Sequence, residues 1–352
     1  MSARAESHCV RDILREPGEL RKCLDNLLES GRPAFDRAAA LLRDASEVYI
    51  AGIGASWAAG MAAQSFFAQA GRSVNLVDAS ELMHQPSFRP GSAIVILSRS
   101  GKSIEVVTLL DRASKAGAKV VGVTNAPDSP LGTRSDVPLL LGIGFDHAIS
   151  VVTYSTVALG GALVAAAATG QLRAADVKSL RSSLEVLPKA IPAWRERLAG
   201  NPWFTAEKGT YFLARQAGLA SAHETRLLWE ETAKAPATAM TAGAFRHGAQ
   251  EIVEPGLRFG LWLDGTLRRE EDLAMCRDLR KLGSRVLLIG QGLPQDAGDL
   301  VFELPPVPPA WQFVTEIVPA QLAAEHLAGL RGVDCDSFRL GAHVVTKEGG
   351  LL

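Results

Sequence analysis

The sequence predicts an α/β protein with two doubly wound parallel sheets, each an αβα sandwich, preceded by N-terminal helices and followed by an ordered C-terminal tail. Short apolar runs alternate with helical stretches, which is typical of parallel sheets. The alternation occurs twice, because the runs Tyr49–Gly52 and Tyr211–Ala214 are each followed by a small-residue turn and a helix. A chain of 352 residues also has the length of roughly two domains.

The composition is that of a soluble globular protein. Apolar residues make up 47% of the chain and charged residues 21%, which is enough apolar content for a substantial core. The net charge of −1 creates no overall field toward nucleic acid or a membrane, so we expect neither as a partner. The four cysteines lack metal-ligand spacing and the chain starts without an apolar signal segment. We therefore expect buried thiols and a cytoplasmic location.

The elements are predicted in chain order from periodicity and from glycine and proline positions. Residues 9–44 are predicted to be mostly helical, with a break at Pro17-Gly18 and a new helix from Glu19. The first sheet is predicted to contain strands 47–52, 74–77, 93–97, 119–124 and 137–141, before a helical stretch over 151–197. The second cycle is predicted to contain strands 210–214, 258–263, 285–289 and 300–304, and helices 221–234, 268–282 and 313–330.

These predictions divide the chain into four parts. A helical lead-in spans residues 1–45, the first sheet domain with its connecting helices spans 46–197, the second sheet domain spans 198–330, and the tail spans 331–352. The longest apolar run, Val157 to Thr169, is shorter than the ~20 residues that cross a bilayer. We interpret it as a buried core helix.

The stretch from Ala93 to Val107 carries the clearest signal of a ligand site. An apolar strand runs into the polar turn Ser98-Arg99-Ser100-Gly101-Lys102-Ser103, which is followed by a helix. The first amides of a helix have no partners and the helix dipole is positive there, so hydroxyls and amides together bind phosphate. The alternative is a serine-rich loop that only caps a helix.

Two nucleotide-binding motifs do not fit the chain. Gly101-Lys102-Ser103 resembles the end of a P-loop, but that motif requires glycine where Ile96 stands. The stretch Gly52 to Trp57 begins like a dinucleotide fingerprint, but Trp57 takes the third glycine position. No metal-ligand cluster is evident either, and we predict no cofactor.

Taken together with Gly54-Ala55-Ser56 and Phe245-Arg246-His247-Gly248, the serine turn resembles the tandem sugar isomerase (SIS) family. The resemblance covers nearly the whole chain and is to the isomerase half of glucosamine-6-phosphate synthase and to related amino-sugar-phosphate deaminases and deglycases. The segment Arg11 to Pro17 is similar to the short lead-in of that half.

The resemblance implies that the serine turn holds a phosphorylated sugar or amino sugar. Arg99 stands where the synthase has Gln, and its guanidinium would add charge-assisted phosphate contacts. Val151 and Val152 stand where the family has Thr-Lys. The positions that the resemblance assigns to substrate or phosphate are Ser56, Ser98, Arg99, Ser100, Ser103, Ser150, Val151 and Glu224.

The resemblance also implies the catalytic groups. Glu231 matches the family glutamate, which moves a proton between C1 and C2 of the sugar. His247 matches the histidine that opens the sugar ring, and the family donates this histidine from the neighbouring subunit, so a homodimer is implied. Without the resemblance, Glu231 would be interpreted as part of a solvated helix face and His247 as a helix end.

Three departures from the synthase limit what can be carried over. The chain opens with Met1-Ser2-Ala3 instead of a cysteine nucleophile, and Leu228 replaces a family lysine. The tail lysine that forms an imine with the sugar is replaced by His343, which we include among the catalytic candidates, and Lys347 lies further on.

We therefore expect a phosphosugar isomerase, or an amino-sugar-phosphate deaminase or deglycase, that acts on a hexose 6-phosphate derivative without glutamine-dependent amino transfer. The alternative is a non-catalytic regulator that binds sugar phosphate. The loss of the tail lysine keeps this alternative open.

Overall fold

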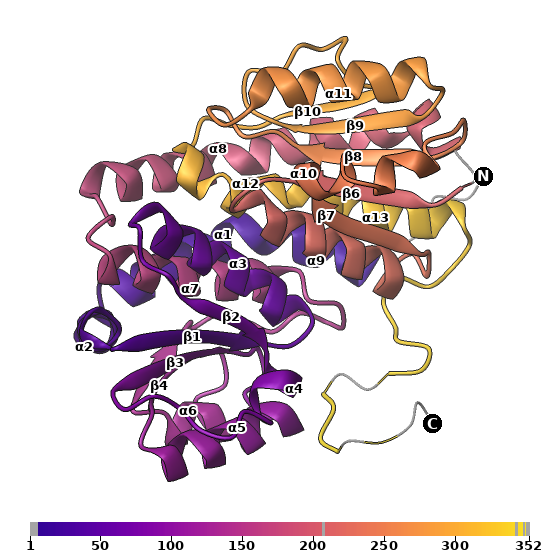
Figure 1. Ribbon diagram of the computed structural model, residues 1–352. Helices are drawn as coiled ribbons and strands as arrows, with labels where there is room; N and C mark the ends of the chain where they lie inside the picture. Colours follow the sequence, from indigo (N-terminus) through magenta and orange to yellow (C-terminus); the bar gives the residue numbers. More distant parts are fainter. Residues whose placement is uncertain (1–5, 206–207, 342–343, 348, 350–352) are drawn as a thin grey trace. The chain divides into compact units, whose positions relative to one another are not determined.

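The structure is a computed structural model that describes residues 6–205, 208–341, 344–347 and 349 (Figure 1). The chain forms two compact units. We call Gly18–Val177 with the residues from Phe338 onward the first unit, and the residues up to Pro17 with Lys178–Ser337 the second unit. None of the described helices combines the length and apolar character needed to cross a bilayer.

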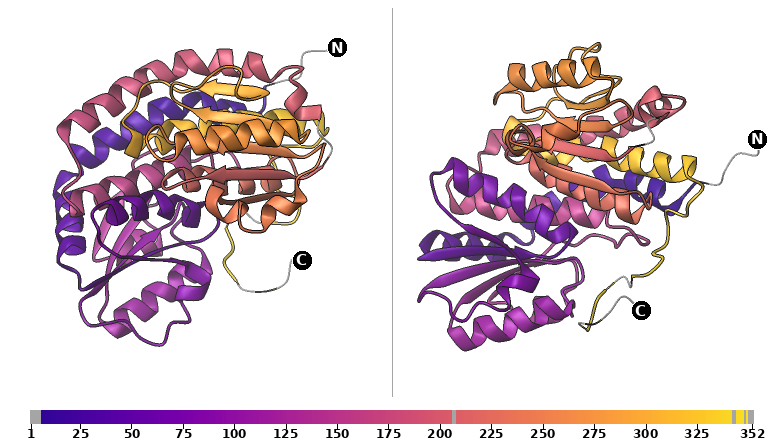
Figure 2. Two further views of the ribbon diagram at one scale, coloured as in Figure 1. Left: turned by 45° about the horizontal axis from the view of Figure 1, so that its top comes forward. Right: turned by 45° about the vertical axis from the view of Figure 1, so that its right-hand side comes forward.

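The first unit is built on a parallel five-stranded sheet with helices on both faces. Its strands are β1 (Glu47–Gly52), β2 (Asn75–Asp78), β3 (Ser92–Leu97), β4 (Lys119–Thr124) and β5 (Val137–Leu140), in the order β2-β1-β3-β4-β5. Its helices are α2 (Arg32–Asp44), α3 (Ala55–Gln69), α4 (Ala79–Leu82), α5 (Ile104–Ala116), α6 (Pro130–Arg134) and α7 (Val152–Ala168). Figure 2 shows the three layers from two further sides.

The second unit contains a second parallel five-stranded sheet. Its strands are β6 (Thr210–Ala214), β7 (Ala237–Thr241), β8 (Arg258–Trp262), β9 (Arg285–Gly290) and β10 (Leu300–Glu303). The helices that follow α8 (Ala174–Leu198) are η1 (Pro202–Thr205), α9 (Gly218–Glu231), α10 (Ala242–Phe245), η2 (Ala249–Ile252), α11 (Arg269–Lys281), η3 (Pro309–Trp311), α12 (Phe313–Glu316) and α13 (Val318–Leu330). The strand order β7-β6-β8-β9-β10 repeats that of the first sheet, so the predicted fold class is confirmed.

The apolar run near residue 160 forms a buried helix, as predicted. Nearly every residue of α7 is buried, and α7 packs along α3 over one face of the first sheet. The four cysteines are free and buried, also as predicted. Burial raises the pKa of the Cys276 thiol to about 12, so this thiol stays protonated and unreactive near neutrality.

The predicted break at Pro17-Gly18 is wrong, because both residues lie inside helix α1 (His8–Leu28). A proline inside a helix removes one hydrogen bond and costs ~3 kcal/mol. Ile13 and Leu20, on either side of Pro17, are completely buried, and the packing of such side chains offsets that cost.

Strand β7 is absent from the strands that the sequence predicts. It lies at the edge of the second sheet and its residues are half-buried or exposed. Its sequence, Ala-Thr-Ala-Met-Thr, therefore lacks the continuous apolar run of a buried parallel strand. An edge strand needs less apolar side-chain surface, because only one of its sides is covered by a neighbouring strand.

Candidate functional site

The two small-residue turns of the first unit lie at one edge of its sheet, as predicted. Strand β1 pairs with β3, so the turns that follow these two strands are neighbours at the strand carboxyl ends. Helix α3, which follows β1, and helix α5, which follows β3, cover opposite faces of the sheet (Figure 1). This is the topological switch point, at which open parallel sheets bind ligands.

Glycines shape both turns. A Cβ atom on Gly52 would lie 2.6 Å from the carbonyl carbon of Ser56, so only glycine lets the first turn of α3 approach β1 this closely. Ser56 is half-buried in that turn. In the serine turn Gly101 has a φ of +61°, and a Cβ there would lie 2.2 Å from the Ser129 hydroxyl oxygen. A side chain at position 101 would therefore force the serine turn to move.

Hydrogen bonds hold the serine turn in shape. Ser98 is buried, and its hydroxyl accepts a hydrogen bond from the amide of Gly101 at 3.0 Å. The hydroxyl of Ser100 accepts from the amide of Lys102 at 3.3 Å, and the Thr124 hydroxyl donates to the carbonyl of Arg99 at 3.2 Å. The turn is thus preorganised by its own serines.

Ser103 ends the turn and occupies the N-cap position of α5. Its backbone is extended, with φ −60° and ψ 147°, and its hydroxyl makes no cap hydrogen bond. The residue is only 8% exposed, and its hydroxyl oxygen has no hydrogen-bond partner within the described part of the chain. A buried polar group without a partner costs about 1–3 kcal/mol, so this hydroxyl at a positive helix end is suited to an anionic ligand.

Arg99 connects the serine turn to the loop before α7. Its guanidinium donates to the carbonyl of Ala148 and to the hydroxyl of Ser150, both at 3.2 Å. Two predicted site residues are therefore brought together, and Arg99 as a residue is half-buried. One of the roles of Arg99 is to position the Ser150 loop.

The next residue, Val151, lies in the core instead of lining a surface. It is completely buried, and its amide donates to the carboxylate of Asp146. The same carboxylate accepts from the amides of Val152 and Thr153, both at 3.0 Å. We therefore leave Val151 out of the proposed binding residues and add Asp146 as the group that fixes the Ser150 loop. An aspartate shortly before an apolar helix is the sequence signal that identifies it.

The second unit carries the predicted acids on one helix. Helix α9 starts after the carboxyl end of β6 and leads into β7, so its last residue, Glu231, lies at the amino edge of the second sheet (Figure 1). Glu231 is half-buried, whereas Glu224 on the same helix is only 1% exposed. The rule that ligands bind at strand carboxyl ends therefore does not predict the place of Glu231.

His247 lies at the other edge of the second sheet. It follows α10, which begins directly after the carboxyl end of β7, and it is exposed. Its amide donates to the carbonyl of Ala244 at 3.0 Å. Of the two tail candidates, His343 lies outside the described residues and Lys347 is exposed.

A buried carboxyl group anchors the start of α9. Glu316 accepts hydrogen bonds from the hydroxyl of Ser221 and from the side-chain amide of Gln312, both at 2.8 Å. The Gln312 amide also donates to the carbonyl of Leu263 at 3.0 Å, so its nitrogen cannot turn away from Glu316. Burial, with a further contribution from the charge of Asp264, raises the pKa of Glu316 to about 7.

This pKa predicts a pH-dependent stability. A raised pKa in the folded state gives a contribution that is complete below the unfolded pKa of ~4.5 and is lost as pH rises through 7. Glu316→Gln cannot ionise, so its free energy of unfolding relative to the natural chain should rise by up to roughly 3 kcal/mol between pH 4.5 and 8. Urea titrations at several pH values measure this, with exposed Glu270→Gln as the control. Parallel pH profiles for Glu316→Gln and the natural chain would contradict the assignment.

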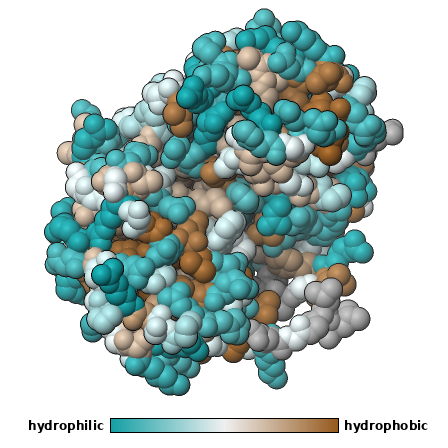
Figure 3. Space-filling model, in the orientation of Figure 1, coloured by the Kyte–Doolittle hydropathy of each residue, from teal (hydrophilic) through white to brown (hydrophobic). Residues whose placement is uncertain are grey.

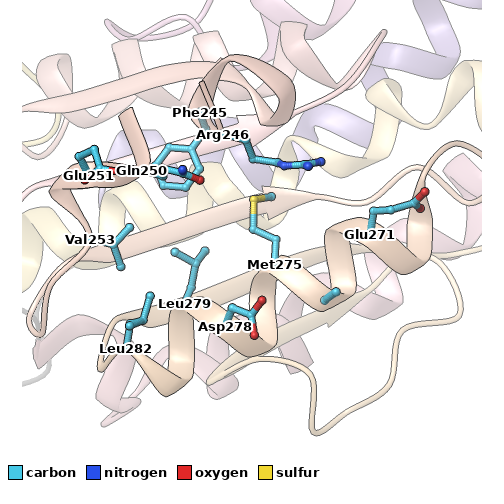
Figure 4. Close-up of a pocket in the computed structure, with 11 residues that line it drawn as sticks. Phe245, Arg246, Gln250, Glu251, Val253, Glu271, Met275, Asp278, Leu279 and Leu282 are labelled. Atoms are coloured by element: carbon cyan, nitrogen blue, oxygen red, sulfur yellow. The ribbon is translucent and has the colours of Figure 1, made fainter. Parts of the chain in front are cut away.

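A groove of about 480 Å³ lies on the second unit between α11 and the segment 245–253 (Figure 4). Phe245, Met275 and Leu279 form part of its apolar lining, and Figure 3 shows apolar surface beside α11. Carboxylates and Arg246 supply its polar atoms. None of the residues predicted to bind the sugar lines this groove, and its lining residue Arg246 directly precedes His247 in the chain.

Comparison with known proteins agrees with the fold and with the serine turn. Residues 41–169, which include both turns of the first unit, match the model of the SIS domain. Over 96% of the chain, the sequence is 28% identical to the glutamine–fructose-6-phosphate aminotransferase (isomerizing) of Aeropyrum pernix. The chain spans about half to three-fifths of the length of the curated relatives it matches.

Two solved structures share the fold over nearly the whole chain. The C-terminal domain of glucosamine-fructose-6-phosphate aminotransferase from Francisella tularensis matches with a TM-score of 0.82 and 21% identity, covering 95% of this chain and 99% of that one. Glucosamine-6-phosphate deaminase from Thermotoga maritima matches with a TM-score of 0.80 and 20% identity, covering 96% and 99%. Residues 41–169 therefore match a SIS domain, and the chain is similar over nearly its whole length to the isomerizing aminotransferases.

Proposed function

We propose that this protein is an enzyme that acts on a phosphorylated sugar or amino sugar, by aldose–ketose isomerisation with or without release of an amine. One observation carries the proposal: the buried hydroxyl of Ser103 has no hydrogen-bond partner among the described residues and stands at the start of α5. A phosphate oxygen supplies the negative charge and the acceptor that this hydroxyl lacks. The neighbouring amide of Ile104 already donates to the carbonyl of Val345 at 3.0 Å. A cytoplasmic location is part of the proposal.

In this proposal the first unit holds the phosphate. Ser98, Ser100 and Ser103 belong to the turn, and the hydroxyls of Ser98 and Ser100 fix its shape by accepting from the amides of Gly101 and Lys102. Arg99 adds positive charge while it fixes Ser150. Ser56, at the start of α3, contributes from the neighbouring turn.

The second unit supplies the acid–base groups. Glu231 takes the proton from one of the first two carbons of the open-chain sugar and returns it to the other. Glu224 is only 1% exposed, so we leave it out of the proposed sugar contacts, like Val151. His247 opens the ring by moving the proton of the anomeric hydroxyl to the ring oxygen, a step that suits imidazole because its pKa is near neutrality.

We propose that His247 acts on the sugar bound by the partner in a homodimer. Within one chain, Glu231 precedes β7 and His247 follows it, so the two residues stand at opposite edges of the same sheet. A strand of five residues extends roughly 16 Å, which is too far for both side chains of one chain to act on adjacent sugar carbons. A His247 that comes from a partner chain is not limited by the length of β7.

The names of the relatives support the class of substrate. The curated relative is an isomerizing aminotransferase of fructose 6-phosphate, and one structural neighbour is a glucosamine-6-phosphate deaminase. The chain covers 57% of that relative, so the activity named for the whole relative is not carried over to this chain. Isomerisation and deamination share the proton transfer assigned to Glu231. In deamination this transfer converts the amine into an imine, which takes up water and releases ammonia.

One observation favours a regulator as the second candidate. Leu228, at the position of a family lysine, is completely enclosed in the core, so the site differs from that of the synthase. A regulator would bind the sugar phosphate and be stabilised by it without forming product.

The test is turnover on a panel of hexose 6-phosphates and their 2-amino and 1-amino derivatives, with the unphosphorylated sugars as controls. We expect product from at least one phosphorylated compound and none from its unphosphorylated counterpart. Stabilisation by a sugar phosphate without any product would instead support the regulator. Neither product nor binding would overturn both candidates.

Ser103→Ala separates ligand binding from folding. In the ligand-free protein the substitution removes a hydroxyl that has no partner, so stability should stay equal or rise slightly. Binding of the accepted sugar phosphate should weaken by at least roughly 10-fold, because a charge-assisted hydrogen bond is lost. Calorimetric titration and thermal unfolding measure the two effects. The control is Ser114→Ala, on an exposed position of α5, and equal affinity in both variants would contradict the phosphate site.

A further inference from the structure

The backbone just after Glu231 is held by cationic side chains. Helix α9 ends at Glu231, and the ammonium group of Lys234 donates back to the carbonyl of Glu231. The same ammonium donates to the carbonyl of Ser337 at 2.7 Å. Lys234 therefore joins the end of α9 to the segment that follows α13.

Arg331 holds the same connection from the other side. It caps α13, and its Nε donates to the carbonyl of Ala233 at 3.0 Å. One of its terminal nitrogens donates to the carbonyl of Lys234 at 3.3 Å. Three of the four carbonyls from Glu231 to Lys234, those of Glu231, Ala233 and Lys234, thus accept hydrogen bonds from a lysine or an arginine. We call these contacts the cationic clamp.

The backbone of Lys234 is strained, and packing alone does not explain this strain. Lys234 has a φ of +52°, a conformation that favours glycine and that side chains rarely adopt. A residue in this conformation costs about 1 kcal/mol or more, and such strain concentrates at functional sites. Lysine at this position, unlike glycine, supplies an ammonium group that donates to two carbonyls.

The position of Glu231 explains why such a clamp is useful. Glu231 is the last residue of α9, where the final carbonyls lack partners within the helix and the helix end frays easily. A base that moves a proton between adjacent carbons must be held to within about 0.5 Å. Cations at a helix C-terminus satisfy those carbonyls and favour the helix dipole.

We propose that Lys234 and Arg331 are positioning residues, which fix the backbone of Glu231 for proton transfer. The inference rests on the proposed function, in which Glu231 is the base. The two cations touch main-chain carbonyls and act on the reaction only through Glu231.

Lys234→Gly is the sharpest test, because it removes the ammonium group and relieves the backbone strain together. We expect stability to be equal or higher, while kcat falls roughly 10- to 100-fold and KM changes little. Arg331→Met should lower kcat in the same way, and Lys234→Arg should restore much of the rate. The matched control is Gln216→Gly, which relieves a φ of 48° in the turn before α9 and should leave kcat unchanged.

A double variant identifies the route of the effect. If the clamp acts through Glu231, adding Lys234→Gly to Glu231→Gln should not lower the residual rate further. Full kcat in Lys234→Gly, or a loss that multiplies with that of Glu231→Gln, would overturn the clamp and leave the proposed function intact. Wild-type rates in Glu231→Gln would overturn the base assignment and the clamp with it.

Discussion

Replacement of Glu231 by glutamine is expected to lower kcat by about 10³-fold, while the affinity for the accepted sugar phosphate stays close to that of the natural chain. The amide has nearly the same size and shape as the carboxylate, but it cannot accept a proton from carbon. The binding groups of the serine turn belong to the first unit, whereas Glu231 belongs to the second, so the substitution leaves the phosphate contacts in place.

Hydrogen exchange gives the most direct readout. With substrate deuterated at C2 or in deuterated solvent, the natural chain should exchange the C1 and C2 hydrogens, and the variant should exchange them at the reduced rate of kcat. The control is Glu230→Gln, which removes an exposed carboxylate on the same helix turn. Exchange at the natural rate in Glu231→Gln would show that another group is the base.

The sequence predicts most of the fold because its strands are short apolar runs bounded by glycine and polar residues. Strand β4 and strand β6 have the bounds predicted for them, since each is buried and flanked by clear turn signals. The sequence does not predict strand β7, because an edge strand can be half-exposed and then lacks a continuous apolar run. Pro17 leads to a wrong prediction of a helix break, because local helix propensity contains no information on the tertiary packing that stabilises α1.

The candidate site is predictable where its residues are adjacent in the chain. The serine turn is one stretch, and the hydrogen bonds between its own residues span three residues or fewer. The contact of Arg99 with Ser150 spans 51 residues, and that of Arg331 with Ala233 spans 98. Such contacts depend on the folded chain, so neither the clamp nor the Glu316 network is visible in spacing or composition.

Mixing two inactive variants tests the dimer directly. Chains carrying Glu231→Gln and chains carrying His247→Asn should each have little activity, because each homodimer lacks one group at both sites. A mixed dimer brings the intact Glu231 of one chain and the intact His247 of the other to one site, and leaves the second site without either. Random pairing makes half of the dimers mixed, so coexpression should restore about a quarter of the natural kcat.

The expectation follows from the fold of the second unit. The length of β7 separates Glu231 from His247 within a chain, so in the proposed dimer each site uses the Glu231 of one chain and the His247 of the other. His247 is exposed and Asn keeps its polarity, so the substitution should not unfold the chain. The control is coexpression of two differently tagged copies of Glu231→Gln, which should stay inactive. If the mixed sample is no more active than its components although mixed dimers are isolated through their tags, His247 does not act across the dimer.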